Sequence, residues 1–155
     1  MPNHHLIGRC GLYCGACAIY RAYQDGQQFQ EALAKRHNCS AEQVRCEGCQ
    51  DLTEACWGYD CPIVLCLRTQ GYEFCYEYVN WTNKNCEKYA QIANSYAARG
   101  EDVYANLHAI QAGCVKDWLQ QQEQRWRCPA CGQPCAVWDD NCRWCGEALS
   151  TIGKS

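Results

Sequence analysis

The spacing of apolar residues along the chain predicts a mainly helical protein. From 18 to 37, apolar residues recur at loosely helical intervals between Ile19 and Ala34, which indicates a helix. Gly26 lies in its middle, and we expect it to divide this helix in two because glycine weakens a helix interior. Ser40, with acidic and amide residues close behind it, predicts the N-cap of a short turn.

Proline and glycine residues are expected to set the bounds of the next helices. Pro62 suits the first position of a helix, and Gly71 is expected to close it. The short aromatic stretch 72–78 fits either a strand or a further turn. A helix over about 86–99 follows, and Gly100 ends it.

A long helix over 102–124 is expected to follow. Its apolar residues recur at steps of four and three and so share one face: Val103, Leu107, Ile110, Cys114 and Trp118. Gly113 is expected to bend this helix, and Cys114 is expected to be buried. The polar end of the helix predicts a boundary between a helical, cysteine-rich metal-binding domain at 1–124 and a second domain at 125–155.

The C-terminal region carries the pattern C-x2-C, ten residues, C-x2-C. Its four thiols are Cys128, Cys131, Cys142 and Cys145. A glycine follows each pair, at 132 and 146, and relieves a tight turn because glycine tolerates positive φ. Four thiolates around one ion form the closed tetrahedral site of structural zinc. We therefore predict a small β zinc ribbon here, with Cys135 as a competitor for its metal.

The first half of the chain holds a second, denser group of thiols. Its candidate metal ligands are Cys10, Cys14, Cys17, Cys46, Cys49, Cys61, Cys66 and Cys75. Isolated buried cysteines do not cluster in this way, so we expect at least one metal site, although several of these residues could be small buried hydrophobes. The metal is zinc or a [4Fe–4S] cluster, because a compact thiol triplet plus a distant Cys61-Pro62 suits such a cluster. Spacing does not assign thiols to a shared metal.

The composition favours cysteines that bind metal over cysteines that form disulfide bonds. The 155 residues include 17 Cys, but Leu, Ile and Val are sparse, so metal sites are expected to share the stabilising role. No signal peptide and no transmembrane stretch is apparent, which predicts a cytoplasmic chain with reduced thiols and no membrane partner. A net charge of −3 makes a nucleic-acid partner an unfavoured reading.

Several cysteine motifs together resemble a family of uncharacterised cysteine-rich proteins of bacteria and archaea. The motifs are Cys10-Gly-Leu-Tyr-Cys14-Gly-Ala-Cys17, Arg45-Cys46-Glu-Gly-Cys49, Cys61-Pro-Ile-Val-Leu-Cys66, Gly71-Tyr-Glu-Phe-Cys75 and Asn85-Cys86-Glu-Lys-Tyr. Longer members end, like this chain, in a tryptophan-led ribbon. The resemblance implies a shared fold with metal binding and supplies no catalytic residue. The family pattern places another Cys where this chain has Tyr78. A second metal site in the helical domain at 1–124, which we call the body, would therefore have to recruit Cys86 or Cys56 or be lost.

These observations predict a zinc-binding protein of interaction or regulatory type, with an unidentified protein partner and no evident catalytic constellation. Trp126, Trp138 and Trp144 are candidate partner contacts, or else they pack the ribbon on the body. The main alternative is an iron–sulfur protein in electron transfer or redox sensing. A third is an enzyme that uses a thiolate such as Cys61, whose position at a helix start favours ionisation.

Overall fold

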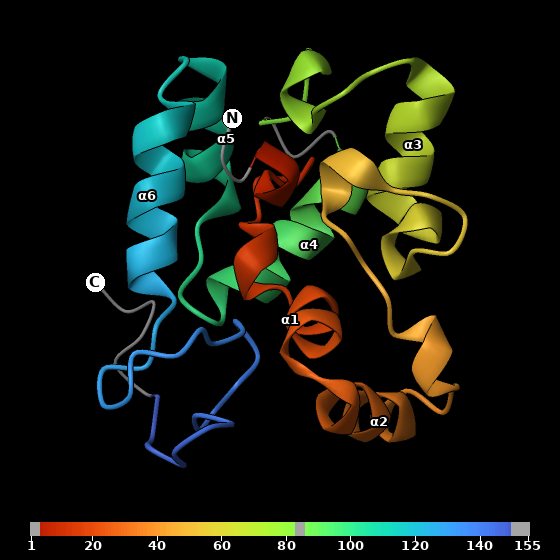
Figure 1. Ribbon diagram of the computed structural model, residues 1–155. Coiled ribbons are helices and arrows are strands. Elements are labelled where there is room, and N and C mark those ends of the chain that lie inside the picture. The colour runs from red at the N-terminus through yellow and green to blue at the C-terminus, as the bar shows by residue number, and fades with distance from the viewer. Residues whose placement is uncertain (1–3, 83–85, 150–155) are drawn as a thin grey trace.

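The computed structural model describes residues 4–82 and 86–149 and confirms a mainly helical chain (Figure 1). Short 3-10 turns and loops join six α-helices in these residues. The helices are α1 Ala18–Asp25, α2 Gln27–Arg36, α3 Pro62–Gln70, α4 Glu87–Ala97, α5 Val103–Gln111 and α6 Val115–Arg125. None of the described helices is long and apolar enough to cross a membrane.

The residues predicted to begin, end or divide helices do so in the structure. Gly26, with φ of 140°, separates α1 from α2. Pro62 opens α3, and Gly71 ends it in the left-handed conformation with its N–H bonded to the last carbonyls. Ser40 forms a capping box in front of a 3-10 turn. The aromatic stretch 72–78 contains a 3-10 turn rather than a strand.

The expected helix over 102–124 is in fact two helices, α5 and α6. Gly113 has φ of 85° and ends the first helical run, so it breaks the helix rather than bending it. Cys114 becomes the residue before α6 and is exposed, which corrects the prediction that it is buried. The other four residues of the predicted apolar face are buried.

The segment from Leu6 to Cys14 contributes to the main core and lies between α6 and α3, with α4 crossing the centre of the view (Figure 1). Its backbone polar groups are satisfied by side chains from later helices. Tyr89 donates its hydroxyl to the Cys10 carbonyl at 2.8 Å, and Asn106 donates its amide to the Gly11 carbonyl at 2.9 Å. These bonds place the first predicted thiols on a fixed backbone.

A buried carboxylate joins this core to the end of α6. Glu101 is 1% exposed and accepts hydrogen bonds from Asn106 at 3.0 Å and from Arg125 and Trp126 at 3.1 Å each. A buried charge is tolerated only when it is paired and hydrogen-bonded, and Glu101 is both. The direction in which the chain leaves α6 is thereby fixed.

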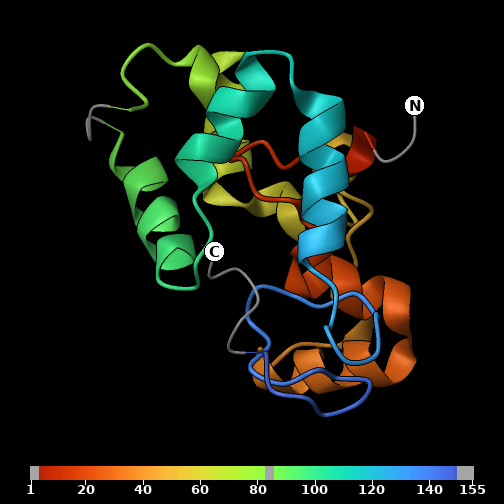
Figure 2. The same ribbon diagram turned by 90° about the vertical axis from the view of Figure 1, so that its left-hand side faces the viewer.

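The predicted β ribbon is wrong for the described residues, which contain no strand. The C-terminal segment has two isolated antiparallel bridges, Arg127 with Pro134 and Asn141 with Ala148. The chain between them does not pair with itself because it bonds to the body instead. Val137 donates its N–H to the Ala16 carbonyl, in the 3-10 turn before α1, and accepts a bond from Arg99, beyond α4. Figure 2 shows the resulting loops lying below α6 and beside α1 and α2.

Two glycine substitutions test the position of the N-terminal segment in the main core. A Cβ at Gly11 would lie 2.6 Å from the Val103 carbonyl oxygen and 2.9 Å from Leu107 Cγ, whereas a Cβ at Gly71 meets nothing within 4 Å. Both glycines have positive φ. We expect Gly71→Ala to lower the free energy of unfolding by about 1 kcal/mol and Gly11→Ala by about 3 kcal/mol, because only the latter adds overpacking to backbone strain. Urea titration under reducing conditions measures both, and equal losses would contradict the placement.

Candidate metal centre

Two similar turns present the C-terminal thiols. Gly132 donates its N–H to the Cys128 carbonyl at 2.8 Å, and Gly146 donates to the Cys142 carbonyl at 2.9 Å. Both glycines have positive φ, 76° and 81°, as the sequence predicts. Each turn brings the two cysteines of one C-x2-C pair to the same side of the backbone.

The four predicted thiols converge on one point. Their Sγ atoms lie within 4.8 Å of one another, and they form the one such group of three or more candidate ligands among the described residues. The Cys128–Cys145 and Cys131–Cys142 sulfur pairs are each 3.6 Å apart. A tetrahedral ion with metal–sulfur bonds of about 2.3 Å separates its sulfurs by about 3.8 Å. This group, the cysteine knuckle, therefore has the geometry to bind one metal ion.

The thiols of the knuckle differ in acidity. Burial opposes ionisation of Cys142, but backbone N–H groups, including that of Trp144 at 3.4 Å, and neighbouring thiols lower its pKa to about 7. A backbone N–H also favours the Cys145 thiolate, yet desolvation and the three other thiols raise its pKa to about 12. The pKa of Cys142 is thus lowered, while desolvation and neighbouring thiols raise the pKa values of Cys131 and Cys145. A bound cation opposes these upward shifts because it lies between the sulfurs.

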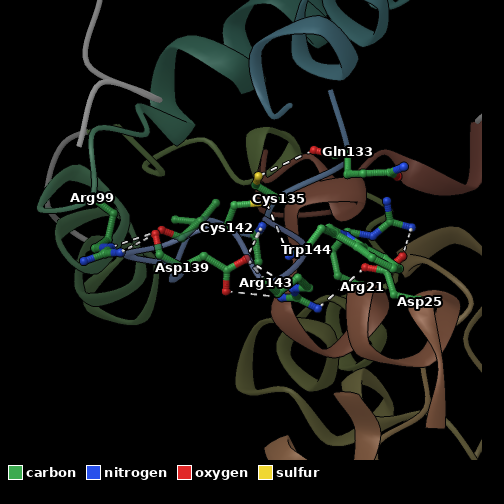
Figure 3. A network of polar contacts seen from close by, with 11 residues as sticks. Arg21, Asp25, Arg99, Gln133, Cys135, Asp139, Cys142, Arg143 and Trp144 are labelled. Atoms are coloured by element: carbon green, nitrogen blue, oxygen red, sulfur yellow. Dashed lines mark hydrogen bonds and ion pairs between the residues drawn. The ribbon is translucent and has the colours of Figure 1, made fainter. Parts of the chain in front are cut away.

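Cys135 lies outside the knuckle. It is 1% exposed, and burial raises its pKa to about 12. Its thiol donates to the Gln133 carbonyl at 3.6 Å (Figure 3). Cys135 is therefore a buried packing residue, and the group that could hold a metal consists of the two symmetric C-x2-C pairs.

An arginine inside the second C-x2-C pair attaches the knuckle to α1 and α2 (Figure 3). Arg143 donates to the Asp139 carboxylate at 3.1 and 3.2 Å and lies 3.6 Å from the Asp25 carboxylate at the end of α1. Its guanidinium lies 5.2 Å from the ring of Phe29 in α2. Asp25 also pairs with Arg21 at 3.7 Å. The sequence analysis missed this contact, because nothing in the spacing connects an arginine at 143 with an aspartate at 25.

The three tryptophans of this region have different environments. Trp126 is buried. Trp138 is 42% exposed and packs against Tyr96 at a ring distance of 5.8 Å. Trp144 is 43% exposed and lies 5.1 Å from the Phe29 ring. Trp138 and Trp144 thus contact the body and also present part of each indole to solvent.

Six of the eight predicted body ligands line one cavity of about 790 Å³. They are Cys10, Cys14, Cys17, Cys46, Cys49 and Cys61. Cys66 and Cys75 do not line it. Burial, followed by the nearby thiols of Cys86, Cys66 and Cys61, raises the pKa of Cys75 to about 12. Cys86, which the sequence analysis considered as a recruited thiol, therefore lies near Cys75.

The cavity thiols interact with one another. The Cys14 thiol donates to Cys49, which lowers the pKa of Cys49, and a bond from Arg9 acts in the same direction. Arg9 also donates to the Cys49 carbonyl at 3.1 Å, a contact the sequence did not reveal. Burial and then the negative charge of Cys49 raise the pKa of Cys10. Cys56, by contrast, is buried against Thr53, whose N–H donates to its sulfur at 3.4 Å.

The pH dependence of stability tests the burial of the Asp25 carboxylate beside Arg143. Burial raises the pKa of Asp25, although Arg21 and Arg143 oppose the shift. A carboxyl with a raised folded-state pKa stabilises the fold below its unfolded pKa of about 3.9 and loses that contribution as pH rises through the folded value. The unfolding free energy of Asp25→Asn minus that of the unchanged protein should therefore increase between about pH 4 and pH 7. Parallel urea titrations measure it, and a constant or decreasing difference would contradict the burial of this charge.

One protein family matches the part of the chain that carries the body thiols. Residues 6–91, more than half of the chain, match the family described as "Protein of unknown function (DUF3795)". No curated protein and no solved structure matches the chain. The matched residues include all eight predicted body ligands and end before the knuckle. The chain belongs to the DUF3795 family.

Proposed function

We propose that this chain is a zinc-binding protein of interaction or regulatory type, in which zinc at the cysteine knuckle has a structural role. The observation that carries the proposal is the convergence of four Sγ atoms within 4.8 Å, with two pairs at 3.6 Å. Four thiolates leave no coordination position for a substrate, which is typical of structural rather than catalytic zinc.

The C-terminal segment is attached to the body by bonds such as those of Val137 and Arg143, but it has little packing of its own around the knuckle. Its own buried cluster consists of Leu149 and three cysteines. The two isolated bridges provide no continuous ladder of backbone bonds. Metal binding supplies folding free energy directly where a core is this small.

A zinc-fixed knuckle would have two consequences. It would hold Arg143 where it reaches Asp25, so the segment stays attached to α1 and α2. It would also hold Trp138 and Trp144 with about two-fifths of each side chain exposed. Partly exposed indoles are typical anchors of protein interfaces, which supports a protein partner.

Cobalt(II) titration tests the zinc site. Each tetrathiolate site gives thiolate-to-metal absorption, and Cys131→Ala should remove one bound equivalent per chain. In this variant the affinity of the knuckle for cobalt should fall by more than roughly 100-fold. Loss of an outer-shell partner already costs up to about that much, and Cys131 is a direct ligand. Zinc should displace the cobalt from the unchanged protein.

Cys135→Ala is the matched control, because this thiol lies in the same segment but outside the sulfur group. It should keep the full cobalt equivalent. Loss of that equivalent in Cys135→Ala, or its retention in Cys131→Ala, would refute the assigned ligands.

A further inference from the structure

The cavity in the helical body is lined by thiols from three separate parts of the chain. The N-terminal segment supplies Cys10, Cys14 and Cys17, the loop after α2 supplies Cys46 and Cys49, and the start of α3 supplies Cys61. Apolar side chains from α1, α3 and α4 complete the walls around them: Ile19, Val64 and Ile92. Ordinary packing cysteines behave as separate small hydrophobes, whereas six thiols line this one cavity.

The spacing of these thiols does not suit a single ion. A tetrahedral zinc site needs its sulfurs about 3.8 Å apart. In the two described stretches, 4–82 and 86–149, the knuckle is the one group whose ligand atoms lie within 4.8 Å of one another. The body thiols therefore surround a larger volume than one ion fills. An iron–sulfur cluster holds its thiolates further apart, because the inorganic core lies between them.

Four of the six thiols are partly exposed where they line the cavity, whereas the other two are buried. The partly exposed thiols are Cys10, Cys17, Cys49 and Cys61. Cys14 is more deeply buried and donates to Cys49. Cys46 packs into a second core cluster with Val44 and residues of α1 and α2.

We propose that Cys10, Cys17, Cys49 and Cys61 hold a [4Fe–4S] cluster in this cavity. The set combines two thiols of one compact turn with two distant ones, and Pro62 follows the last, as in known clusters of this type. The proposal is independent of zinc at the knuckle, whose ligands lie elsewhere in the chain.

The surroundings suit the charge of such a cluster. Four thiolates around an iron–sulfur core carry net negative charge, which a buried site must offset. Arg9 bonds to the Cys49 carbonyl at 3.1 Å, and Arg36 and His37 line the cavity on the α2 side, against one acidic lining residue, Asp60. The remaining walls are mostly apolar.

Anaerobic reconstitution of the full chain with ferrous iron, sulfide and dithiothreitol tests the proposal. The expected product contains about four iron and four sulfide per chain, shows broad visible absorption, and gives a paramagnetic signal after dithionite reduction. Zinc uptake by the body thiols without sulfide, or iron without sulfide, would overturn it.

Variants then identify the ligands. Cys49→Ala and Cys61→Ala should each lose most of the cluster absorption, while Cys14→Ala and the exposed Cys114→Ala should keep it. Cys131→Ala should lose zinc and keep the cluster, so failure of the zinc proposal and failure of the cluster proposal give different results. A cluster retained in both Cys49→Ala and Cys61→Ala would overturn the assignment. Zinc content at the knuckle, measured on the same samples, reports that each body variant has folded, and the retained cluster reports it for Cys131→Ala.

Discussion

Thiols that lie a few ångströms apart resist ionisation together, because each thiolate raises the cost of the next. The knuckle has this arrangement, since its sulfurs are as close as 3.6 Å and desolvation and neighbouring thiols raise the pKa of Cys145. A cation between the sulfurs turns this repulsion into attraction. The chain has 17 Cys and few aliphatic residues, so the placement of its thiols is a main constraint on the structure beside apolar packing.

The knuckle and the body are coupled by charge as well as by packing. Arg143 belongs to the knuckle, but its partners include Asp25 and Phe29 in α1 and α2. Trp138, between the two C-x2-C pairs, also lines the thiol-rich cavity. Trp138 thus lies at the boundary between the knuckle segment and the cavity.

Local sequence signals predicted local structure well. Gly26, Pro62 and Gly71 act through their own backbone preferences, so their effects follow from the sequence alone. The four knuckle thiols were also predictable, because paired C-x2-C turns bring their ligands together whatever surrounds them.

The errors arose where distant contacts decide the outcome. Val137 bonds to the body, and the expected ribbon strands are absent from the described residues for that reason. The break at Gly113 leaves Cys114 exposed although it fits the apolar period. The sharing of body thiols and the Arg143 contact depend on the tertiary fold, which spacing does not encode.

X-ray absorption at the zinc edge of the zinc-loaded protein tests the central claim most directly, because it measures the atoms that surround the ion. The account predicts a single shell of four sulfur atoms at about 2.3 Å in the unchanged protein. It also predicts that Cys131→Ala loses zinc and Cys135→Ala keeps the same shell. A shell containing nitrogen or oxygen, or one that changes in Cys135→Ala, would contradict the four-thiolate knuckle.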